Sequence, residues 1–582
     1  MNQVTKALLL IFIVLCFSCN NNNNLSNSGQ KQKELSSDVE KPLIALCQLW
    51  GFLKYHHPAV AEGNYDWDKE LITKIAEIQK AKDELSWKKI LDNWIDSLPP
   101  IPLNESKSIP DRQTTLKPNY GELFNPVYFL DETIEKINYI LKNAIISENH
   151  YINVDQQSGL MTINNEPDYK EVLIPDLSYR LLSLFKHWNL VNYFFPYRDK
   201  CSQNWNDVLV EMLPEFIHAE NSDDYFLTCL KLHTKIDDSH GFYNSGSNAY
   251  YMYQGMYQAP IDVRFIENEL VVIGILGNDG VVEKAVNIGD IITAINGESV
   301  KDIVKRSLPY TPASNHAVKL RNILKYILRG NNKTIELTLL KNDNRLTVKI
   351  NCYSPGRLAI PDHFKPMQDK EGYQVLDNNI GYVLPSSCKM GDREKGIEKV
   401  LNNTKGVIID FRCYPNDYFS LDFRKHLPVK FTKFSTCSYA NVSYPGYFFV
   451  SNPENFPSTK EPTNAYTNPI VVLVNEFTQS SAEDNVLVLQ TAENTKVIGS
   501  KTAGADGKVT NFNLPCGIVI YMTGLGVYYP DGSDLQQTGV KIDEYIEPTI
   551  QGIKEGRDEI LERAIEIIEG NNKNRTHNIL YK

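Results

Sequence analysis

A pair of serines follows directly after a short apolar segment of the chain. Residues 470–474 read as a buried strand, residues 475–479 as a polar turn, and the stretch from Ser481 to about Thr491 has the apolar spacing of a helix. A serine at such a corner is exposed, and the free N–H groups of the helix favour negative charge beside it. Ser480 or Ser481 is therefore either a nucleophile or a helix cap, and the local pattern alone favours the cap.

A histidine that could take a proton from that serine lies far upstream. The tetrad Asp238-Ser239-His240-Gly241 ends a stretch with helical spacing. An imidazole with an ordinary pKa of about 6.5 accepts a proton at neutral pH, as a general base must. Outside this context, a histidine between such residues is typical of a surface turn.

The serine segment resembles a known peptidase family. The strand, the pattern Asn475-x-x-Thr478-x-Ser480 and the string 497–505 together are similar to the catalytic core of the tail-specific, or carboxy-terminal processing, serine peptidases. The resemblance implies an α/β spiral fold akin to crotonase and ClpP, with Ser480 as nucleophile and Ser481 as the second choice. The family's lysine, 25 residues after the serine, is absent because Ala505 stands there, and nothing in the spacing shows that Lys501 or Lys508 replaces it.

The tricorn-like and retinoid-binding-protein-like branches of that family carry a histidine instead of the lysine. Their Asp-Ser-His-Gly element matches residues 238–241, which implies His240 as general base and Ser239 as the residue that orients it. The branch's supporting glutamate corresponds to Gln536, which can hydrogen-bond Ser239 or another polar partner but carries no charge.

The resemblance also implies an oxyanion hole formed by backbone N–H groups. Ser481 supplies one of them, and Asn416 supplies the other from a turn where the family has glycines. Asn tolerates left-handed backbone angles, so the turn is expected to persist. Asp417, beside it, would be unfavourable near an oxyanion unless it points away.

The segment 285–300 has a Gly-Asp turn, an apolar strand and an Asn-Gly turn in that order. This string resembles the signature of bacterial PDZ domains, which bind extended peptides by strand addition. The resemblance implies a PDZ-like β domain over 255–353, with Gly289 and Asp290 in substrate binding.

Two segments near the amino-terminal end repeat each other. Trp50 and Trp188, Pro58 and Pro196, and Trp67 and Trp205 are each 138 positions apart. Apolar residues recur at helical spacing before each proline, so we expect one helical hairpin used twice.

The first residues are typical of an export signal. Lys6 precedes an apolar run over 7–17, too short to span a bilayer, which needs about 20 residues. Cys19 follows, and then a polar stretch, as in bacterial lipoproteins, although Cys16 stands where such signals usually have Leu. Lipidation of Cys19 is favoured over an ordinary secretory signal. We therefore expect an exported protein, anchored to a membrane by lipid and located in the periplasm or at the cell surface.

The composition indicates which classes of binding partner are unexpected for this chain. The net charge of −11 comes from 71 acidic and 60 basic residues scattered along the chain, with no basic stripe for nucleic acid. The cysteines lack the close spacing of zinc or redox sites, and no metal or organic cofactor is implied. Disulfide pairing cannot be assigned from spacing.

The expected architecture is multidomain α+β. It comprises a signal peptide (1–19), a tether (20–38), a first helical repeat (39–100), a mixed region without an assigned role (101–170), a second helical repeat (171–250), the PDZ-like domain (255–353) and the catalytic domain (375–570). We expect a serine endopeptidase that acts outside the cytoplasm. Its expected substrates are peptides or unfolded protein tails, and binding through their carboxyl ends is one expected mode. The alternative is a catalytically inactive peptide-binding or scaffolding protein on the same frame.

Overall fold

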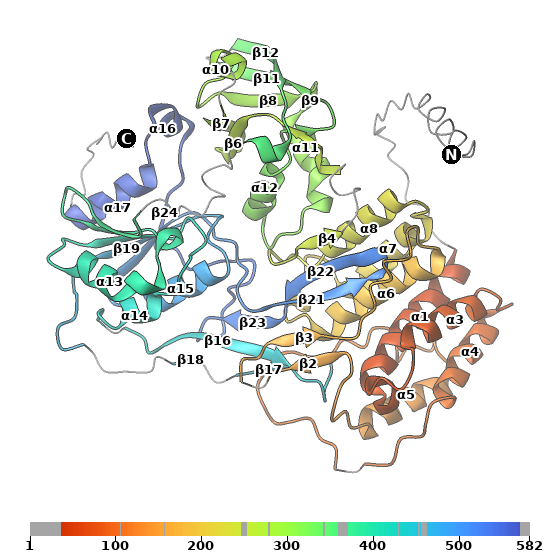
Figure 1. Ribbon diagram of the computed structural model, residues 1–582. Coiled ribbons are helices and arrows are strands. Elements are labelled where there is room, and N and C mark those ends of the chain that lie inside the picture. Colours follow the sequence, from red (N-terminus) through yellow and green to blue (C-terminus); the bar gives the residue numbers. More distant parts are fainter. Residues whose placement is uncertain are drawn as a thin grey trace, which may run out of the picture.

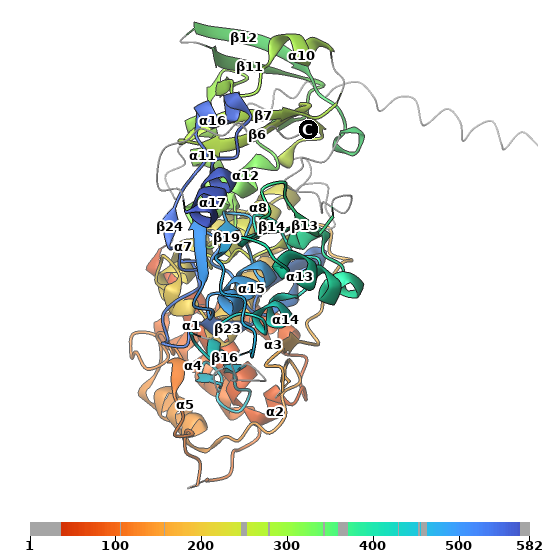
Figure 2. The same ribbon diagram turned by 90° about the vertical axis from the view of Figure 1, so that its left-hand side faces the viewer.

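The computed structural model describes residues 36–570 except 105, 156, 246–252, 278–279, 342–343, 359–370, 429, 452–453 and 456–461. Three units are visible in Figure 1: a helical unit in red to yellow, a β-rich middle unit in green, and an α/β unit in teal to blue. Viewed from the side in Figure 2, the middle unit and the amino-terminal helices lie at opposite ends of the molecule. Cys19 and the expected export signal lie outside the described residues.

The helical unit contains the two repeats. Its helices are α1 (Ser37–His56), α2 (Pro58–Ala61), α3 (Trp67–Ile78), α4 (Glu84–Asp96), α5 (Asp131–Asn143), α6 (Leu177–Phe194), α7 (Trp205–His218) and α8 (Ser222–Thr234). In the first repeat the indole N–H groups of Trp50 and Trp67 each donate to the other residue's carbonyl oxygen at 3.0 Å. Trp188 and Trp205 form the same reciprocal pair, at 2.8 and 3.0 Å. The tryptophans are thus core residues that fix one hairpin twice.

The two repeats pack on each other through equivalent positions. A Cβ atom at Gly51 in α1 would lie 1.8 Å from Oδ1 of Asn189 in α6, the residue 138 positions later. The Asn189 amide in turn donates to the Cys47 carbonyl oxygen at 3.0 Å. Contact between equivalent positions is the mark of two-fold packing, so α1 and α6 cross about a local pseudo-two-fold axis.

A buried ion network joins the repeats to the mixed region. Glu166 pairs with Lys54 of α1 at 2.6 Å and with Lys186 of α6 at 2.9 Å, and Lys186 also pairs with Asp68 of α3 at 2.9 Å. All four side chains are at most 6% exposed. The mixed region, to which the sequence assigned no role, therefore provides the charge that allows two lysines to be buried.

Short strands extend the helical unit toward the α/β unit. One sheet contains β1 (Thr114–Leu116), β17 (Phe448–Val450), β16 (Lys433–Ala440), β18 (Glu454–Asn455) and β23 (Leu525–Tyr528). A hairpin is formed by β2 (Ile152–Val154) and β3 (Met161–Ile163). A third sheet contains β21 (Val509–Leu514), β22 (Ile518–Thr523) and β4 (Tyr243–Ser245). In Figure 1, β21 and β22 leave the α/β unit and lie along the helical unit beside β4 and α8. Segments of the helical and α/β units thus share sheets.

The middle unit is an antiparallel sheet in the order β12-β11-β8-β7-β6, with β9 paired to β8. Its strands are β6 (Ile261–Ile266), β7 (Glu269–Ile275), β8 (Ile291–Ile295), β9 (Glu298–Ser299), β11 (Thr334–Lys341) and β12 (Asn344–Asn351), its helices are α10 (Gly280–Ala285), α11 (Val300–Ser307) and α12 (His316–Leu324), and β5 (Tyr257–Gln258) pairs with β10 (Arg329–Gly330). Strand β6 lies at the edge of this sheet and contacts α12.

The α/β unit has the sheet order β13-β14-β15-β19-β20-β24, parallel except for the pair β13 and β14. Its strands are β13 (Tyr373–Val375), β14 (Gly381–Val383), β15 (Val407–Asp410), β19 (Ile470–Val474), β20 (Thr495–Gly499) and β24 (Glu544–Tyr545), and its helices are α13 (Arg393–Leu401), α14 (Ser420–Arg424), α15 (Ser481–Leu489), α16 (Ile550–Glu555) and α17 (Glu559–Glu569). Every residue of β15 and β19 is buried, as expected for strands covered on both faces.

The carboxy-terminal helix begins slightly later than its sequence pattern predicts. Apolar spacing predicts a surface helix from about residue 555 to residue 568, and α17 spans Glu559–Glu569 after α16 has ended at Glu555. Gly556 ends α16 in the left-handed conformation, with φ of 67°, which a residue without Cβ adopts readily.

The ion network leads to a stability prediction. Replacing Glu166 with Gln leaves Lys54 buried without a counter-charge, so we expect the free energy of unfolding to fall by about 3–5 kcal/mol. The control is Glu77→Gln, because Glu77 is 41% exposed and pairs with Lys74 on the surface; its cost should stay below about 1 kcal/mol. Urea unfolding followed by tryptophan fluorescence measures both, and equal costs would contradict this account.

Candidate active site

Ser480 stands between β19 and α15 in a strained backbone conformation. Its φ and ψ are 55° and −122°, outside the regions that residues with a Cβ atom normally occupy. The preceding turn is fixed by Thr478, whose hydroxyl donates to the Phe411 carbonyl oxygen at 2.7 Å and accepts from the Asn475 N–H at 3.0 Å. Such strain costs about 1–3 kcal/mol and persists where the surroundings impose it, commonly at functional sites. The serine is half-buried at the start of the helix.

A buried carboxylate holds this turn against the loop after β20. Glu483, in the first turn of α15, accepts from the N–H groups of Ser480, Gly504 and Ala505 at 3.3, 2.8 and 3.0 Å, and from the Thr502 hydroxyl at 2.6 Å. Burial raises the pKa of Glu483, although the four hydrogen bonds act in the opposite direction. The sequence analysis did not identify this residue; its place three positions after a capping serine is the signal that could have done so.

His240 lies in the loop between α8 and β4 and is 3% exposed. Its Nδ1 atom is 2.9 Å from the Thr523 hydroxyl oxygen at the end of β22, and its backbone N–H donates to Asp238 at 3.0 Å. The other ring nitrogen, Nε2, is buried and has no hydrogen-bond partner among the described residues. Burial lowers the pKa of His240 below its ordinary value, and the opposing effect of Asp238 does not cancel this. The ring is thus a neutral base at physiological pH.

The segments that carry Ser480 and His240 are brought together by three hydrogen bonds. The side chain of Gln479 donates to the Ser239 carbonyl oxygen at 3.1 Å, the Ser239 hydroxyl donates to the Ala503 carbonyl oxygen at 3.4 Å, and the Ser480 N–H donates to the Ala505 carbonyl oxygen at 3.0 Å. Ser480 and His240, which are 240 positions apart in the chain, therefore lie on adjacent segments. Gln479, the residue before Ser480, is bonded to Ser239, the residue before His240.

Ser239 and Gln536 lie near the histidine but do not hold its ring. The Ser239 hydroxyl also accepts from the Ser314 N–H at 2.8 Å, and the Gln536 amide donates to the Ser314 hydroxyl at 3.4 Å. The expected orienting contact from Ser239 to the ring is therefore replaced by Thr523. Gln536 joins the network through Ser314, and its buried Oε1 has no partner among the described residues.

The two expected oxyanion donors differ in availability. The N–H of Ser481, in the first turn of α15, has no hydrogen-bond partner within the described part of the chain. The N–H of Asn416 donates to the Pro385 carbonyl oxygen at 2.9 Å, so the prediction that it is a free donor does not hold in this structure. Asp417 pairs with Arg393, so the carboxylate is neutralised by its own partner.

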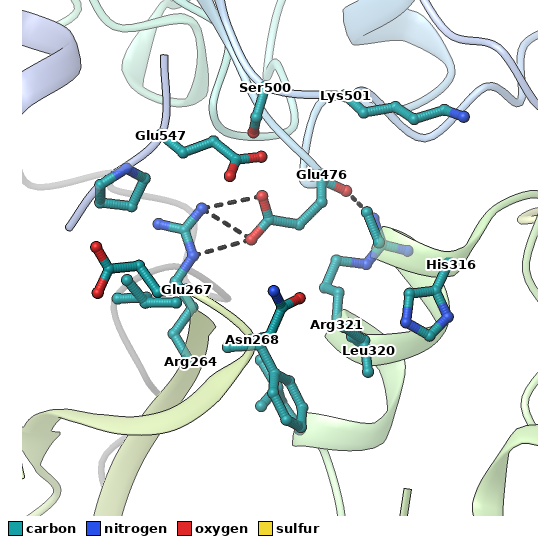
Figure 3. Close-up of a pocket in the computed structure, with 15 residues that line it drawn as sticks. Arg264, Glu267, Asn268, His316, Leu320, Arg321, Glu476, Ser500, Lys501 and Glu547 are labelled. Carbon is teal, nitrogen blue, oxygen red and sulfur yellow. Dashed lines mark hydrogen bonds and ion pairs between the residues drawn. The ribbon is translucent and has the colours of Figure 1, made fainter. Parts of the chain in front are cut away.

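The lysines near the site have other environments. Lys508 donates to the Ser158 carbonyl oxygen at 2.8 Å. Lys501 borders a cavity beside α12, and Figure 3 shows its side chain pointing away from Glu476 and Ser500. Ala505 is buried where the lysine-type enzymes have their base. Neither lysine therefore has a contact with Ser480 among the described residues.

Gly289 and Asp290 do not form an open binding site. The Gly289 N–H donates to the Val272 carbonyl oxygen at 2.8 Å, and a Cβ atom at this glycine would lie 2.2 Å from the Lys554 side chain. Asp290 accepts from the Asn287 N–H at 2.7 Å and pairs with Lys341 at 2.9 Å. The polar groups of this turn are bonded within the sheet of the middle unit, and a role for Gly289 and Asp290 in substrate binding stays a prediction.

A cavity lies between the middle unit and the α/β unit, and neither Gly289 nor Asp290 lines it. It has a volume of about 220 Å³ and is lined by β6, α12 and segments around Glu476, Ser500 and Glu547 (Figure 3). Arg264 of β6 donates twice to the Glu476 carboxylate, at 2.9 Å each. Arg321 of α12 donates to the Glu476 carbonyl oxygen at 2.7 Å and to the Gln479 side chain at 2.9 Å. The groove between β6 and α12 thus ends at the turn that precedes Ser480.

The described residues contain no cluster of His, Cys, Asp or Glu suited to a metal ion. The eight cysteines within them are all free thiols. No helix in the described ranges is both long and apolar enough to cross a bilayer.

Comparison with known proteins identifies a family for part of the chain. Residues 419–546 match the model of Peptidase family S41, which supports the assignment of the chain as a serine hydrolase. No curated protein matches the chain. The matched segment includes Ser480, Thr523 and Gln536, whereas His240 and Asn416 lie outside it.

Two solved structures are similar to the chain. The crystal structure of mature CPAF has 14% identity, covers 68% of this chain and 99% of its own, and has a TM-score of 0.53. The structure of mature CPAF complexed with lactacystin has the same identity and coverage and a TM-score of 0.51. At this identity the likeness shows the fold alone, which the chain shares with mature CPAF.

The role of Glu483 can be tested by Glu483→Gln. The new amide group must face two of the four donors, so we expect the free energy of unfolding to fall by about 2 kcal/mol or more, and the reactivity of Ser480 to fall with it. Thermal unfolding and labelling by a fluorophosphonate probe measure the two effects. Glu493→Gln, in an exposed position at the end of the same segment, is the control. Unchanged stability in Glu483→Gln would contradict the proposed packing.

Proposed function

We propose that this protein is an extracytoplasmic serine endopeptidase of the carboxy-terminal processing type, which acts on peptides or unfolded protein tails. The observation that carries the proposal is the unpartnered Nε2 atom of a buried, neutral His240, in a segment bonded to the residue beside Ser480. A desolvated lone pair, carried by a segment that is bonded to the residue before a strained serine, is suited to nucleophilic catalysis.

The reaction would proceed through an acyl-enzyme. The Ser480 oxygen attacks the scissile carbonyl carbon while its proton passes to Nε2 of His240, and the amide C–N bond breaks as that proton moves to the leaving amine. Water then releases the acyl group by the same route. The Ser481 N–H is placed to stabilise the oxyanion, and Asn416 can contribute only if its bond to Pro385 opens.

The mechanism requires Nε2 of His240 to come into hydrogen-bond contact with the Ser480 hydroxyl. Nε2 of His240 makes no hydrogen bond in this structure, to Ser480 or to any other described residue. Hydrogen bonds of this kind are commonly long or absent before substrate binds and form in the complex. Rotation of the serine hydroxyl and closure of the adjacent segments would make the contact.

The groove between β6 and α12 supports peptide binding in the middle unit, which we infer to be PDZ-like. An edge strand beside a helix is the element to which an extended peptide adds as a further strand. The chain's tail-binding role would therefore belong to this groove rather than to Gly289 and Asp290. It leads toward the Ser480 turn through Glu476 and Gln479.

A second candidate function is a peptide-binding protein without catalysis. The bonded N–H of Asn416 and the uncharged Gln536 favour it, because both weaken the groups that support a serine nucleophile. The two functions share the groove and differ in the reactivity of Ser480.

Labelling with a fluorophosphonate probe distinguishes them. We expect the purified protein to be labelled at one serine and Ser480→Ala to lose at least 90% of the label, about a tenfold or larger effect, because only an activated hydroxyl attacks phosphorus at a useful rate. Peptide mapping by mass spectrometry locates the site. Loss of label in Ser481→Ala instead would move the nucleophile by one residue, and an unlabelled native protein would favour the binding function.

The location of the protein can be tested at Cys19. If Cys19 carries the lipid, Cys19→Ser should move the protein from the membrane fraction to the soluble fraction of cells, because a polar tether alone has no affinity for a bilayer. Cys16→Leu, which removes the other cysteine of this segment and places there the residue that such signals usually have, is the matched control and should stay with the membrane. Equal distribution of both variants would exclude a lipid anchor at residue 19.

A further inference from the structure

A buried carboxylate, Asp238, lies two residues before His240 in the chain. The family resemblance leads to residue 536 for the acid and does not indicate this one. Asp238 is fully buried and accepts three hydrogen bonds: from the His240 N–H at 3.0 Å, from the Thr523 N–H at 2.7 Å and from the Thr523 hydroxyl at 3.0 Å. Both polar groups of Thr523 are therefore bonded to this one side chain. The same hydroxyl oxygen is 2.9 Å from Nδ1 of the imidazole.

The directions of these hydrogen bonds are fixed by chemistry. An ionised carboxylate can only accept, so the single hydroxyl proton of Thr523 points to Asp238. The hydroxyl oxygen then has only lone pairs to offer to His240, so Nδ1 must carry the ring proton. In a neutral imidazole this leaves the lone pair on Nε2, the atom without a partner. One carboxylate thus decides which nitrogen of the histidine is the base.

The position of Thr523 is set by strand pairing. Strand β22 pairs with β4, with Ile520 opposite Tyr243, and the Tyr521 N–H donates to the Phe242 carbonyl oxygen at 2.9 Å. Figure 1 shows the β21–β22 hairpin beside β4 and α8. Because Thr523 and Asp238 are both 0% exposed, water does not compete for these bonds. The hairpin therefore delivers the hydroxyl to the loop that carries the histidine.

We propose that Asp238 and Thr523 are the positioning residues of the catalytic histidine: the carboxylate orients the threonine hydroxyl, which holds Nδ1 protonated and leaves Nε2 free as the base. The proposal rests on the proposed function for its catalytic meaning. It gives the site the negative charge that Gln536 cannot supply. During proton transfer, Asp238 stabilises the imidazolium through Thr523 and does not itself take the proton.

Three variants and one control test the pair. Thr523→Val keeps the shape and removes the hydroxyl, Thr523→Ser restores it, and Asp238→Asn supplies a donor that can reverse the direction of the threonine bond. Asp237→Asn is the control, because Asp237 is the neighbouring acid and bonds Lys319 and the Ser202 N–H instead of the histidine. Its positive φ of 48° is a conformation that Asn also tolerates.

The first readout is the maximal rate of fluorophosphonate labelling at saturating probe, with the probe concentration at half-maximal rate measured separately. We expect Thr523→Val and Asp238→Asn to lower the maximal rate by about 100-fold or more with little change in the half-saturating concentration, because they remove base function and not probe binding. Thr523→Ser and Asp237→Asn should stay close to the native rate. A native maximal rate in Thr523→Val would overturn the proposal.

The pH profile adds an effect that a purely structural role would not produce. Asp238 is the charged group that acts on the His240 ring within the described residues, and β22 contributes the neutral Thr523. Loss of its charge disfavours the imidazolium, so the acid limb of the labelling rate in Asp238→Asn should move to lower pH while the maximal rate falls. An acid limb that stays in place or moves to higher pH would contradict the relay.

The second readout does not depend on activity. In protein with ¹⁵N-labelled histidine, His240 should show a protonated Nδ1 and an unprotonated Nε2, assigned by comparison with His240→Gln, and Thr523→Val should alter this pattern. If the native protein is not labelled by the probe but shows this tautomer, the proposed peptidase function fails and the positioning pair stands. A proton on Nε2 in the native protein would overturn the pair, whatever the enzyme does.

Discussion

A carboxylate can be kept away from water only if donors or cations surround it, and three buried carboxylates meet this requirement by joining distant parts of the chain. Glu166 binds the two helical repeats through Lys54 and Lys186. Asp238 binds the β22 hairpin to the loop after α8, and Glu483 binds the start of α15 to the loop after β20. Leaving any of these carboxylates unpaired would cost free energy of folding, so each pair of segments is favoured in this one arrangement. The serine and the histidine lie at two of the three.

The proposed site therefore combines a serine, a histidine and a buried acid, and the acid comes from a different position of the chain than the family resemblance implies. The family resemblance leads to the acid position at residue 536, where this chain has Gln and where the contacts reach Ser314. The acid that acts on the ring is Asp238, next to Ser239 in the chain, and it reaches the ring through a hydroxyl from another strand. An Asp-Ser-His-Gly tetrad thus contains both the base and the charge that supports it.

The middle unit is connected to the same turn by a second set of contacts. Arg264 and Arg321 bind Glu476 and Gln479, and Gln479 also donates to Ser239. A ligand in the groove between β6 and α12 would lie against these arginines and hence against the residue that precedes Ser480. Directional hydrogen bonds thus connect the groove to the turn that precedes Ser480.

Local sequence pattern was sufficient for the elements that carry the site. The apolar run 470–474 is strand β19, the helix begins at Ser481, and the offset of 138 positions reappears as matched tryptophan pairs. Strand and helix signals are local, since they depend on side-chain periodicity and on the residues at the ends of each element. The tetrad around His240 was recognised through its resemblance to a family motif, because its local pattern alone is typical of a surface turn.

Tertiary structure alone decided which polar groups meet. Thr523 has no motif around it, and its contact with His240 spans 283 positions of the chain. The N–H of Asn416 had a partner, Pro385, that no turn pattern could reveal, and Gly289 and Asp290 proved to serve their own sheet. Hydrogen bonds between distant segments depend on how sheets and helices pack, and that packing is a property of the whole fold. For this reason the sequence could suggest His240 as the base, and only the structure could suggest Thr523 and Asp238 as the residues that orient it.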